Sequence, residues 1–546
     1  PTPSSDSATG IDDLWHATVV SRGTFVTAKS STSFYASLVA ALNRINQRNG
    51  ESSNVSANST SLQTGTRIYQ AIYQTGTWTG ELRAYSIDST TYALTQVWAA
   101  ASQVPAAASR NIYFLSGSTT KAFTWANLSS AQQTALGSAD IVNYLRGDQS
   151  KELQNGGSFR NRSTRLGDIV DSSPLYDSTT DTVYVAANDG FLHAFNASTG
   201  VERFAIVPTQ LFSQLSVLST ASYTHQFFFD GDIYIKAVPN TALGKTANAT
   251  TSGNSQVLVA SLGRGGNGLI GVDVTDVSSP KILWEFTDTD LGLPIGSPQI
   301  SKSNDSSNPW IVLTGNGINS TNDKAFLFAI NAITGTLVKK IDTTVGSSNG
   351  LINVRGWDFD FNGTIDDVYG GDLKGNLWKF DLNASAGSTW RVNSTPLFQA
   401  KDSSGNAQPI TGGIRIGLST ATQTYGKRFI FFGTGSYITA SDSNNLNTQS
   451  LYGIIDQGSA VSGRTSLRQR TIANVTTKTV GTTTYTVRNV STAAAGDMVG
   501  KSGWYLDLLT PPAPGTQEGE RIVATPQLLS SKVLLVPSIV PLSDPC

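Results

Sequence analysis

The sequence predicts an all-β fold, and within that class a β-propeller preceded by a short helical segment. Three features carry this prediction: abundant turn-forming and aromatic residues, strand-like alternation along most of the chain, and a multi-strand unit that recurs. The 546 residues include 51 Gly, 22 Phe, 17 Tyr and 10 Trp, and only 14% of them are charged. A chain of this length accommodates several domains or one large repeat architecture.

The composition favours an extracellular protein. Ser, Thr, Asn and Gly replace the charged residues of a typical cytosolic surface, and the net charge is −1. A nearly neutral chain gives no bulk attraction to nucleic acid or to a membrane surface. The one cysteine, Cys546, has no partner for an internal disulfide. No apolar run approaches the roughly 18–20 residues of a membrane helix, so we expect no membrane-spanning segment and no nucleic-acid partner.

Residues 1–60 are predicted as an N-terminal segment and linker with one helix at about 33–47. Within SFYASLVAALNRINQ, Leu38, Leu42 and Ile45 recur at the spacing of one helical face. The polar run NGESSNVSANSTS follows as the linker, and residues 61–546 form the predicted propeller domain. The chain opens on PTPSSDS, without an initiator Met or a signal peptide, so we expect a fragment or a mature product.

The propeller prediction depends on a repeated unit of short strands and tight turns. Residues 183–207, VYVAANDGFLHAFNASTGVERFAIV, contain strand, turn, strand, Asn-Ala-x-Thr-Gly turn and strand, and similar units occupy residues 257–286, 310–341 and 367–392. Residues 428–456 form a looser copy, residues 68–87 fit an early blade, and GWYLDL with VLLVPSIVP fits the last. Such sheets pack radially because none buries both faces alone. We expect seven blades.

Two copies of Ala-x-Asn-x-x-Thr-Gly, Ala194–Gly200 and Ala329–Gly335, resemble the blade motif of the quinoprotein (PQQ) dehydrogenases. In that motif a Trp four residues after the Gly docks on a neighbouring blade, whereas this chain has Phe204 and Lys339 there. Turn chemistry explains the remaining positions, because Asn and Thr cap the turn and Gly takes a positive φ. We therefore expect PQQ-dehydrogenase-like blades without a quinone site.

Four other motifs are better explained by structure than by chemistry. GRGGNG at residues 263–268 and GSSNG at residues 346–350 lack the helix that a dinucleotide site or a nucleophile elbow requires. The RGD at Arg146–Asp148 is a short motif that we interpret as a loop anchor, with an integrin role as the weaker alternative. His193 lies on an alternating strand, and three His with one Cys do not build a typical zinc site.

The stretch DFDFNGTID, residues 358–366, is the densest run of oxygen donors in the chain. Side-chain oxygens recur at positions one, three, five and nine, a glycine occupies position six, and position seven offers its backbone carbonyl, as in the first part of an EF-hand loop. Three carboxylates this close repel one another without a cation. The predicted Ca²⁺ ligands are Asp358, Asp360, Asn362, Thr364 and Asp366.

This loop departs from an EF-hand at two points. Tyr369 stands at position twelve in place of the bidentate Glu, and the following VYGGDLKGNLWKF is typical of a hairpin and not of a helix. We interpret the loop as a truncated, EF-hand-like calcium site set on a blade. Mg²⁺ is disfavoured because it prefers fewer protein ligands and more water. The alternative is an acidic turn that binds no metal.

Many blocks in a fixed order, running nearly end to end, resemble the C-terminal domain of the PilC/PilY family of type IV pilus biogenesis factors and tip adhesins. The blocks are DDLWHATVVSRGTF, WTGELRAY, NYLRGDQSKE, FRNRSTRLGDIVDSSP, YVAANDGFLHAF, QPIT, FGTG, SLYGIID, GWYLDL and GERIV. The resemblance implies a modified seven-bladed propeller with one Ca²⁺ in a nine-residue loop. Carried over by position, its ligands would be Asp358, Asp360, Asn362, the carbonyl of Thr364, and Asp366.

The resemblance also implies a role and a location. Family members sit at the pilus tip or outer membrane of Gram-negative bacteria, engage minor pilins, and in some cases bind host cells. Their Ca²⁺-bound state is associated with pilus extension and their ion-free state with retraction and so with twitching motility. The family's variable N-terminal region is absent here, and the chain stops at SDPC, so we expect Cys546 to have lost its partner and the last blade to be truncated.

Two function classes follow. The first is a non-enzymatic, Ca²⁺-dependent binding and assembly module, secreted or at the cell surface, that contacts minor pilins and a host-cell or abiotic surface. The alternative is a quinoprotein-type dehydrogenase, which predicts acids and arginines converging on the propeller channel and a bound chromophore. A third hypothesis is a purely structural scaffold without a metal, which a measurement of calcium binding would support or exclude.

Overall fold

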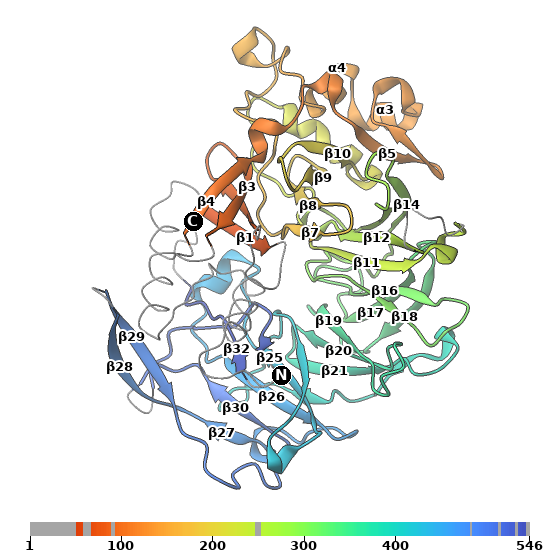
Figure 1. The fold of residues 1–546 in the computed structure, drawn as a ribbon. Coiled ribbons are helices and arrows are strands. Elements are labelled where there is room, and N and C mark those ends of the chain that lie inside the picture. Colours follow the sequence, from red (N-terminus) through yellow and green to blue (C-terminus); the bar gives the residue numbers. More distant parts are fainter. Residues whose placement is uncertain are drawn as a thin grey trace.

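The computed structural model describes residues 51–57, 67–88, 93–245, 253–480, 483–511, 515–529 and 533–541. The helix expected at about 33–47, the DDLWHATVVSRGTF block and Cys546 lie outside the described residues, so those expectations stay predictions. Figure 1 shows antiparallel sheets arranged radially, in chain order, around a centre. This arrangement confirms the predicted β-propeller.

The described strands form six sheets of four or more strands and two hairpins. We number the larger sheets one to six in chain order. Sheet one comprises β1 (Glu51–Ala57), β2 (Arg67–Gln74), β3 (Thr79–Ile87) and β4 (Leu94–Ala99). Sheet two comprises β7 (Leu175–Asp177), β8 (Thr182–Ala187), β9 (Phe191–Asn196) and β10 (Glu202–Ile206), and the hairpin of β5 (Ile112–Ser116) and β6 (Thr119–Ala122) extends it.

Sheets three to five are meanders of neighbouring strands. Sheet three comprises β11 (Ile233–Pro239), β12 (Asn254–Ser261), β13 (Leu269–Asp273) and β14 (Lys281–Phe286). Sheet four comprises β15 (Gln299–Lys302), β16 (Trp310–Gly315), β17 (Phe326–Asn331) and β18 (Leu337–Asp342). Sheet five comprises β19 (Leu351–Trp357), β20 (Asp367–Asp372), β21 (Asn376–Asp381), β22 (Arg391–Val392) and β23 (Phe398–Gln399), which pairs with β21.

Sheet six and the two hairpins complete the described strands. Sheet six comprises, in spatial order, β24 (Arg415–Leu418), β25 (Arg428–Gly433), β26 (Ser450–Asp456), β30 (Gly503–Asp507) and β27 (Arg468–Arg470). The hairpins are β28 (Ile472–Val480) with β29 (Thr483–Val490), and β31 (Gln527–Leu529) with β32 (Val533–Leu535). The helices are short: α3 (Ser130–Leu136), α4 (Ala139–Leu145) and α5 (Phe212–Leu215). None of the described helices is long and apolar enough to cross a membrane.

Two details of the predicted blade boundaries differ in the structure. Strand β1 lies in the stretch expected to be a polar linker and pairs with β2, so sheet one begins before residue 61. The GWYLD strand, β30, pairs with β26 inside sheet six, whereas the VLL strand, β32, pairs with β31. These two segments were expected to share the last blade, and long-range pairing separates them.

The first strands of the sheets surround the centre of the molecule. Strands β1, β7, β11, β15, β19 and β24 contact one another in that order, and β31 contacts β24. Each sheet therefore presents its first strand to a common channel, as a propeller requires. The predicted count of seven blades stays a prediction.

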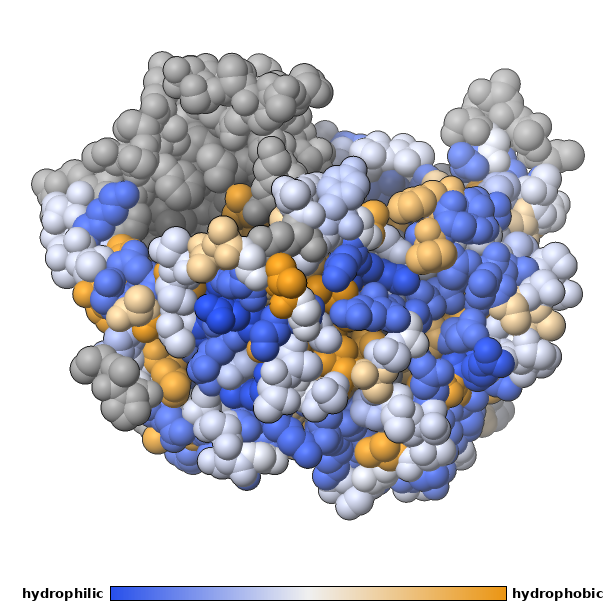
Figure 2. Space-filling view, turned by 90° about the horizontal axis from the view of Figure 1, so that it is seen from below, coloured by the Kyte–Doolittle hydropathy of each residue, from blue (hydrophilic) through white to orange (hydrophobic). Residues whose placement is uncertain are grey.

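The cores lie between the sheets. Strand β8, TVYVAA, is buried at every position, because neighbouring elements cover both faces of sheet two. One cluster joins Leu313 and Leu327 of sheet four to Leu351 and Trp378 of sheet five. On the face shown in Figure 2, hydrophobic residues form small groups among hydrophilic ones. The apolar side chains are therefore buried mainly between one blade and the next.

Docking tryptophans are present, but each comes from the preceding sheet. The indole of Trp98 on β4 donates to Ala197 O at 3.0 Å, and a Cβ at Gly200 would lie 2.7 Å from that ring. Trp284 on β14 does the same to Ala332 O at 2.9 Å, beside Gly335. The expectation of missing docking residues was therefore wrong, because the Trp and the turn it locks lie in different repeats.

The glycine-rich GRGGNG turn between β12 and β13 is a packing feature. Its first half forms a 3₁₀ turn, and a Cβ at Gly265 would lie 1.5 Å from Phe228 O. Strand β13 follows, so no helix N-terminus is available to a phosphate. This agrees with the rejection of a dinucleotide site.

Candidate metal centre

The acidic loop joins the first two strands of sheet five. It leaves β19 at Trp357 and re-enters β20 at Asp367, and these two residues pair across the antiparallel strands. Asp366 N donates to Trp357 O at 2.9 Å and closes the loop. A hairpin of β20 and β21 follows, as the sequence predicts. The nine residues therefore form a compact excursion anchored at both ends.

The turn inside the loop depends on backbone conformation. Gly363 has a φ of +89°, in the left-handed region, and a Cβ there would meet nothing within 4 Å. The need for glycine at position six is therefore conformational and not steric. Phe361 also adopts a positive φ, of +60°, which is uncommon for a bulky residue. The chain reverses sharply here and turns its acidic side chains inward.

Three of the predicted ligand carboxylates converge. Asp358, Asp360 and Asp366 each offer one oxygen, and these oxygens all lie within 4.8 Å of one another. Asp366 is buried, Asp360 is exposed and Asp358 is intermediate. Within the described part of the chain, no Lys, Arg or His forms an ion pair with any of the three. Their negative charge is therefore not balanced by the protein.

Backbone amides hold these carboxylates in position. Gly363 N donates to Asp358 Oδ2 at 2.8 Å, and Phe359 N donates to Asp366 Oδ2 at 2.7 Å. Asn362 N donates to Asp360 Oδ1 at 3.2 Å. The second oxygen of Asp358, Oδ1, is buried and has no hydrogen-bond partner. A buried carboxylate oxygen without a donor is costly, and a hard cation would satisfy it.

The other two predicted ligands lie in the same turn. Asn362 Oδ1 accepts from Thr364 N at 2.7 Å, so this oxygen sits at the base of the turn. The Thr364 hydroxyl lies within hydrogen-bond distance of two acceptors, Asn304 Oδ1 at 2.6 Å and Asn362 Oδ1. Carboxylate, amide and carbonyl oxygens at this spacing fit the oxygen-rich coordination of Ca²⁺. The donor set contains no nitrogen or sulfur ligand, which disfavours zinc.

Asn304 is a supporting residue that sequence reasoning missed. It follows β15 in sheet four, and its Nδ2 donates to Ile365 O and to Asp366 Oδ1, both at 3.0 Å. Ile365 N also donates to Lys302 O at 2.9 Å. The loop is therefore fastened to the neighbouring sheet as well as to its own. No local spacing signals a partner about 60 positions away in the chain.

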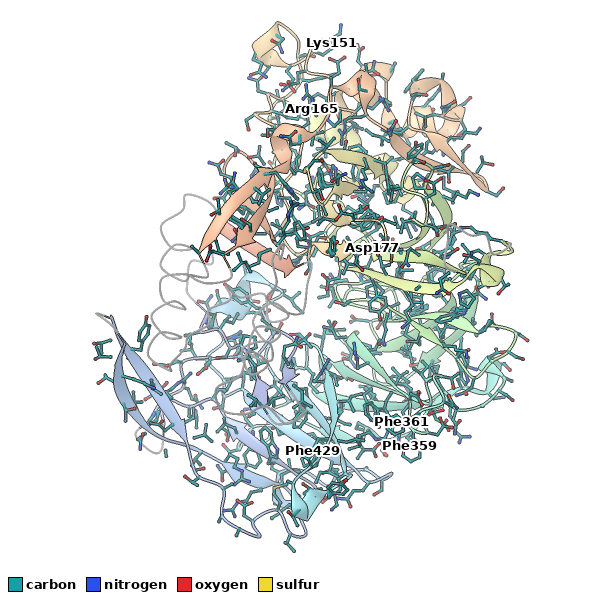
Figure 3. The ribbon with its side chains drawn as sticks, in the orientation of Figure 1. Lys151, Arg165, Asp177, Phe359, Phe361 and Phe429 are labelled. Atoms are coloured by element: carbon teal, nitrogen blue, oxygen red, sulfur yellow. The ribbon has the colours of Figure 1, made fainter. Side chains whose placement is uncertain are left out.

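The outer side of the loop carries exposed aromatic rings. Phe359 and Phe361 are 63% and 71% exposed, and both lie at the loop in Figure 3. The Arg428 guanidinium of sheet six lies 5.1 Å from the centre of the Phe359 ring and pairs with Asp367 at 2.6 Å. The loop therefore contacts sheets four and six, while its aromatic tips face solvent.

The Arg and Asp side chains of the RGD tripeptide form hydrogen bonds within the protein. Arg146, at the end of α4, donates to the backbone carbonyls of Phe123, Ala107 and Arg110 at 2.8 to 3.1 Å. Asp148 Oδ1 accepts from Ser150 N at 2.8 Å. The guanidinium is therefore committed to holding the segment that enters sheet two, in agreement with the loop-anchor interpretation.

A second concentration of charge lies in sheet two around His193. Its Nδ1 lies 2.7 Å from Glu202 Oε1, and its Nε2 lies 3.1 Å from Asp189 Oδ1. Arg110 binds both oxygens of Glu202, at 2.7 and 2.8 Å. Although burial opposes the charged form, Asp189 and Glu202 raise the pKa of His193 to about 9. Against the effect of burial, Arg110 and His193 lower the pKa of Glu202 to about 2. This closed network indicates a structural histidine.

Comparison with known proteins identifies the family. The PilY1 beta-propeller domain matches residues 166–493, more than half of the chain. The chain is 38% identical to a type IV pilus biogenesis factor PilY1 homolog of Xylella fastidiosa, covering 96% of this chain and 43% of the relative. It is 33% identical to type IV pilus biogenesis factor PilY1 of Pseudomonas aeruginosa strain PAK, covering 100% of this chain and 53% of the relative. The chain thus spans about half the length of these relatives.

A solved structure agrees with the sequence matches. The crystal structure of the Pseudomonas aeruginosa PilY1 C-terminal domain superposes with a TM-score of 0.54 at 32% identity, covering 66% of this chain and 76% of that one. The family match, residues 166–493, contains all of sheets three to five and most of sheets two and six, and the fold match is to a domain of the same family. The chain belongs to the PilY1 β-propeller family.

Proposed function

We propose that this chain is the calcium-binding propeller domain of a type IV pilus assembly and tip-adhesin protein. The observation that carries the proposal is the unbalanced cluster of three carboxylates with a buried, unpartnered oxygen on Asp358. The relatives that match the chain are named as type IV pilus biogenesis factors, which supports a pilus role. They also support a location in the cell envelope or at the surface of a Gram-negative bacterium.

In this proposal Asp358, Asp360 and Asp366 bind one Ca²⁺, with Asn362 and the Thr364 carbonyl as further ligands. When bound, the ion neutralises the carboxylate repulsion that otherwise opposes the closed turn. The loop itself holds the ligand side chains in position. Backbone amides fix the carboxylates, Gly363 permits the reversal, and Asn304 fastens the base to sheet four. Ordering the turn therefore restrains the backbone between two sheets.

The exposed rings at the loop provide a route from the ion to a partner. Phe359 and Phe361 flank Asp360 in sequence, so the backbone that places the carboxylates also places the rings. We propose that a minor pilin, or a host-cell or abiotic surface, contacts this face in the ion-bound state. Extension would then be favoured over retraction, with consequences for twitching motility. A population shift of this kind requires that the partner distinguishes the two states.

Calorimetric titration of Ca²⁺ into chelator-treated protein tests the site. We expect one ion per chain, with binding lost in Asp358→Ala and Asp366→Ala while circular dichroism stays unchanged. Asp381→Ala is the matched control, because Asp381 is a sheet-five carboxylate whose ion-pair partner among the described residues is the exposed Arg391. Equal binding by Asp358→Ala and the wild type would contradict the proposal.

A test in cells follows from the first. The Asp358→Ala and Asp381→Ala changes are introduced into the full-length protein, and surface pili and twitching zones are measured with and without Ca²⁺. We expect the Ca²⁺ response to disappear only in Asp358→Ala. A retained response would leave the ion a structural role and remove the regulatory one.

The alternative of a quinoprotein-type dehydrogenase predicted acids and arginines at the channel. Such residues are present there, including Asp232, Arg355 and Arg415. The named relatives are pilus biogenesis factors and not enzymes, so we propose a non-enzymatic role. An absorbance spectrum of the purified protein separates the two, because a bound quinone would add a chromophore beyond the aromatic side chains.

A further inference from the structure

The propeller channel holds a cavity that the calcium loop does not use. It has a volume of about 520 Å³ and is lined from several sheets at once. Asn353 and Arg415 lie on the first strands of sheets five and six, and Ser297 and Asp232 lie just before the first strands of sheets four and three. The segment around Val523–Thr525 closes the remaining side. This volume is within the range of small-molecule sites, roughly 300–1,000 Å³.

One wall of this cavity carries two arginines without a counter-ion. Arg355 on β19 and Arg415 on β24 line the cavity, and these first strands contact each other. Across the residues the structure describes, neither guanidinium forms an ion pair or a hydrogen bond. Arg415 Nε is buried and unpartnered. Burial and the charge of Arg355 lower the pKa of Arg415.

The acids that line the cavity, Asp171, Asp230 and Asp232, each interact with other groups of the protein. Asp171 pairs with Arg264 at 2.9 Å, which accounts for the third arginine of the cavity. Asp232 accepts from the Ser297 hydroxyl. Burial and the neighbouring Asp171 carboxylate raise the pKa of Asp230 well above its ordinary value, which favours its neutral form. The Arg355–Arg415 side of the cavity therefore carries positive charge that no acid among the described residues balances with an ion pair.

Water does not satisfy every hydrogen-bond donor of the two arginines. An arginine on an open surface stays hydrated, and Arg355 is exposed enough to do so. The buried Nε of Arg415 lacks both water access and a protein acceptor. Guanidinium groups present paired N–H donors whose geometry matches a carboxylate or a phosphate. An anion between the two side chains would relieve their repulsion and satisfy the buried donor.

We propose that the central channel binds a small organic anion, through a carboxylate or phosphate group held between Arg355 and Arg415. Asn353 is not a direct ligand group, because its amide donates to Thr411 O at 2.9 Å and accepts from Ser297 N at 3.1 Å. It fixes the wall on which Arg355 stands. This site lies beyond the calcium loop and the proposed pilus role.

The test uses inorganic phosphate and citrate as separate probes. Each is titrated into chelator-treated full-chain protein by calorimetry, with NaCl keeping the ionic strength constant. The variants are Arg355→Gln and Arg415→Gln, and the matched control is Arg391→Gln, an exposed sheet-five arginine outside the cavity. We expect one site per chain and about tenfold weaker binding or more in each cavity variant, because each variant loses a charged hydrogen bond to the anion. A tenfold loss of affinity is about 1.4 kcal/mol. The control should bind as the wild type does.

The two probes separate the sources of the anion. Preference for citrate assigns a carboxylate ligand, and preference for phosphate assigns a phosphate ligand. A melting-temperature series gives an independent readout. The probe should raise the melting temperature of the wild type and not that of Arg415→Gln, which should melt no lower than the wild type without probe because a repulsion has been removed. No saturable binding of either probe, or equal binding by wild type and both cavity variants, would overturn the proposal.

Discussion

The loop of sheet five and the His193 network of sheet two both concentrate carboxylates, but they balance the charge differently. In sheet two, Glu202 and Asp189 face Arg110 and His193, so the chain supplies its own cations. In sheet five, Asp358, Asp360 and Asp366 converge, and no Lys, Arg or His of the described residues forms an ion pair with them. A carboxylate cluster with internal cations is a structural element, whereas a cluster without them depends on an ion from solution.

Burial makes the same distinction. His193, Glu202 and Arg110 are almost entirely inaccessible to solvent, so no ion from solution needs to reach them. The loop side chains range from buried Asp366 to exposed Asp360, so an ion can enter from one side. The stability of sheet two should therefore depend on pH and that of the loop on Ca²⁺.

The largest effect is expected when the internal balance of sheet two is broken. Glu202→Ala leaves Arg110 and His193 buried without their shared carboxylate. Removing one member of a buried ion pair destabilises by about 3–5 kcal/mol. We expect urea denaturation to show a loss of this size, against less than about 1 kcal/mol for Asp381→Ala, which breaks an exposed pair. A loss in Glu202→Ala no greater than in the control would show that the network is not structural.

The pH dependence of sheet two should follow from His193. Its pKa is raised to about 9 from the ordinary 6.5, so the folded state binds a proton more tightly than the unfolded state. The resulting stabilisation is fully present below pH 6.5 and is lost as pH rises through about 9. The shift corresponds to about 3 kcal/mol.

Unfolding free energies measured between pH 6.5 and 9.5 test this dependence, with EDTA present throughout to keep the loop ion-free. His193→Gln should be less stable than the wild type at pH 6.5 and should lose little more as pH rises. A wild-type stability that is flat across this range would contradict protonation of His193. The test also sharpens the comparison, because no calcium dependence is expected in it.

Calcium should act only on the sheet-five loop. At a free Ca²⁺ concentration one hundred times the dissociation constant, one site adds about 2.7 kcal/mol to the free energy of unfolding. We expect this gain in the wild type and in His193→Gln, and its absence in Asp358→Ala, by denaturation with and without Ca²⁺. Loss of the gain in His193→Gln would mean that the two charged regions are coupled.

The fold was largely predictable from the sequence, because blade repeats are local. The strands of residues 183–207 and 310–341 occur as predicted, with their Asn-x-x-Thr-Gly turns. The positions of Asp358, Asp360 and Asp366 were also predictable, since one turn holds them all. Trp98 and Asn304 were not, because each acts on a neighbouring repeat. Periodicity identifies the contacts within a blade, and the contacts between blades need the structure.

The smallest predicted effect tests such an inter-blade contact. Asn304 donates a 3.0 Å hydrogen bond to Asp366 Oδ1, which orients this carboxylate, and it also donates to Ile365 O. Removing a residue that orients a metal ligand typically weakens metal binding about 10- to 100-fold. Because backbone amides still hold the other carboxylates, we expect Asn304→Ala to lie near the lower limit.

The readout for Asn304→Ala is calcium affinity by calorimetry, with Asn383→Ala, an exposed asparagine that follows β21 of sheet five, as the matched control. One ion per chain should still bind, about tenfold more weakly, which is about 1.4 kcal/mol. Complete loss of binding would make Asn304 a ligand, and unchanged affinity would mean that the loop is fixed by sheet five alone. A tenfold weakening would mean that residues of both sheet four and sheet five determine how tightly the loop binds the ion. That arrangement is what a regulatory site needs if a partner is to sense the ion away from its ligands.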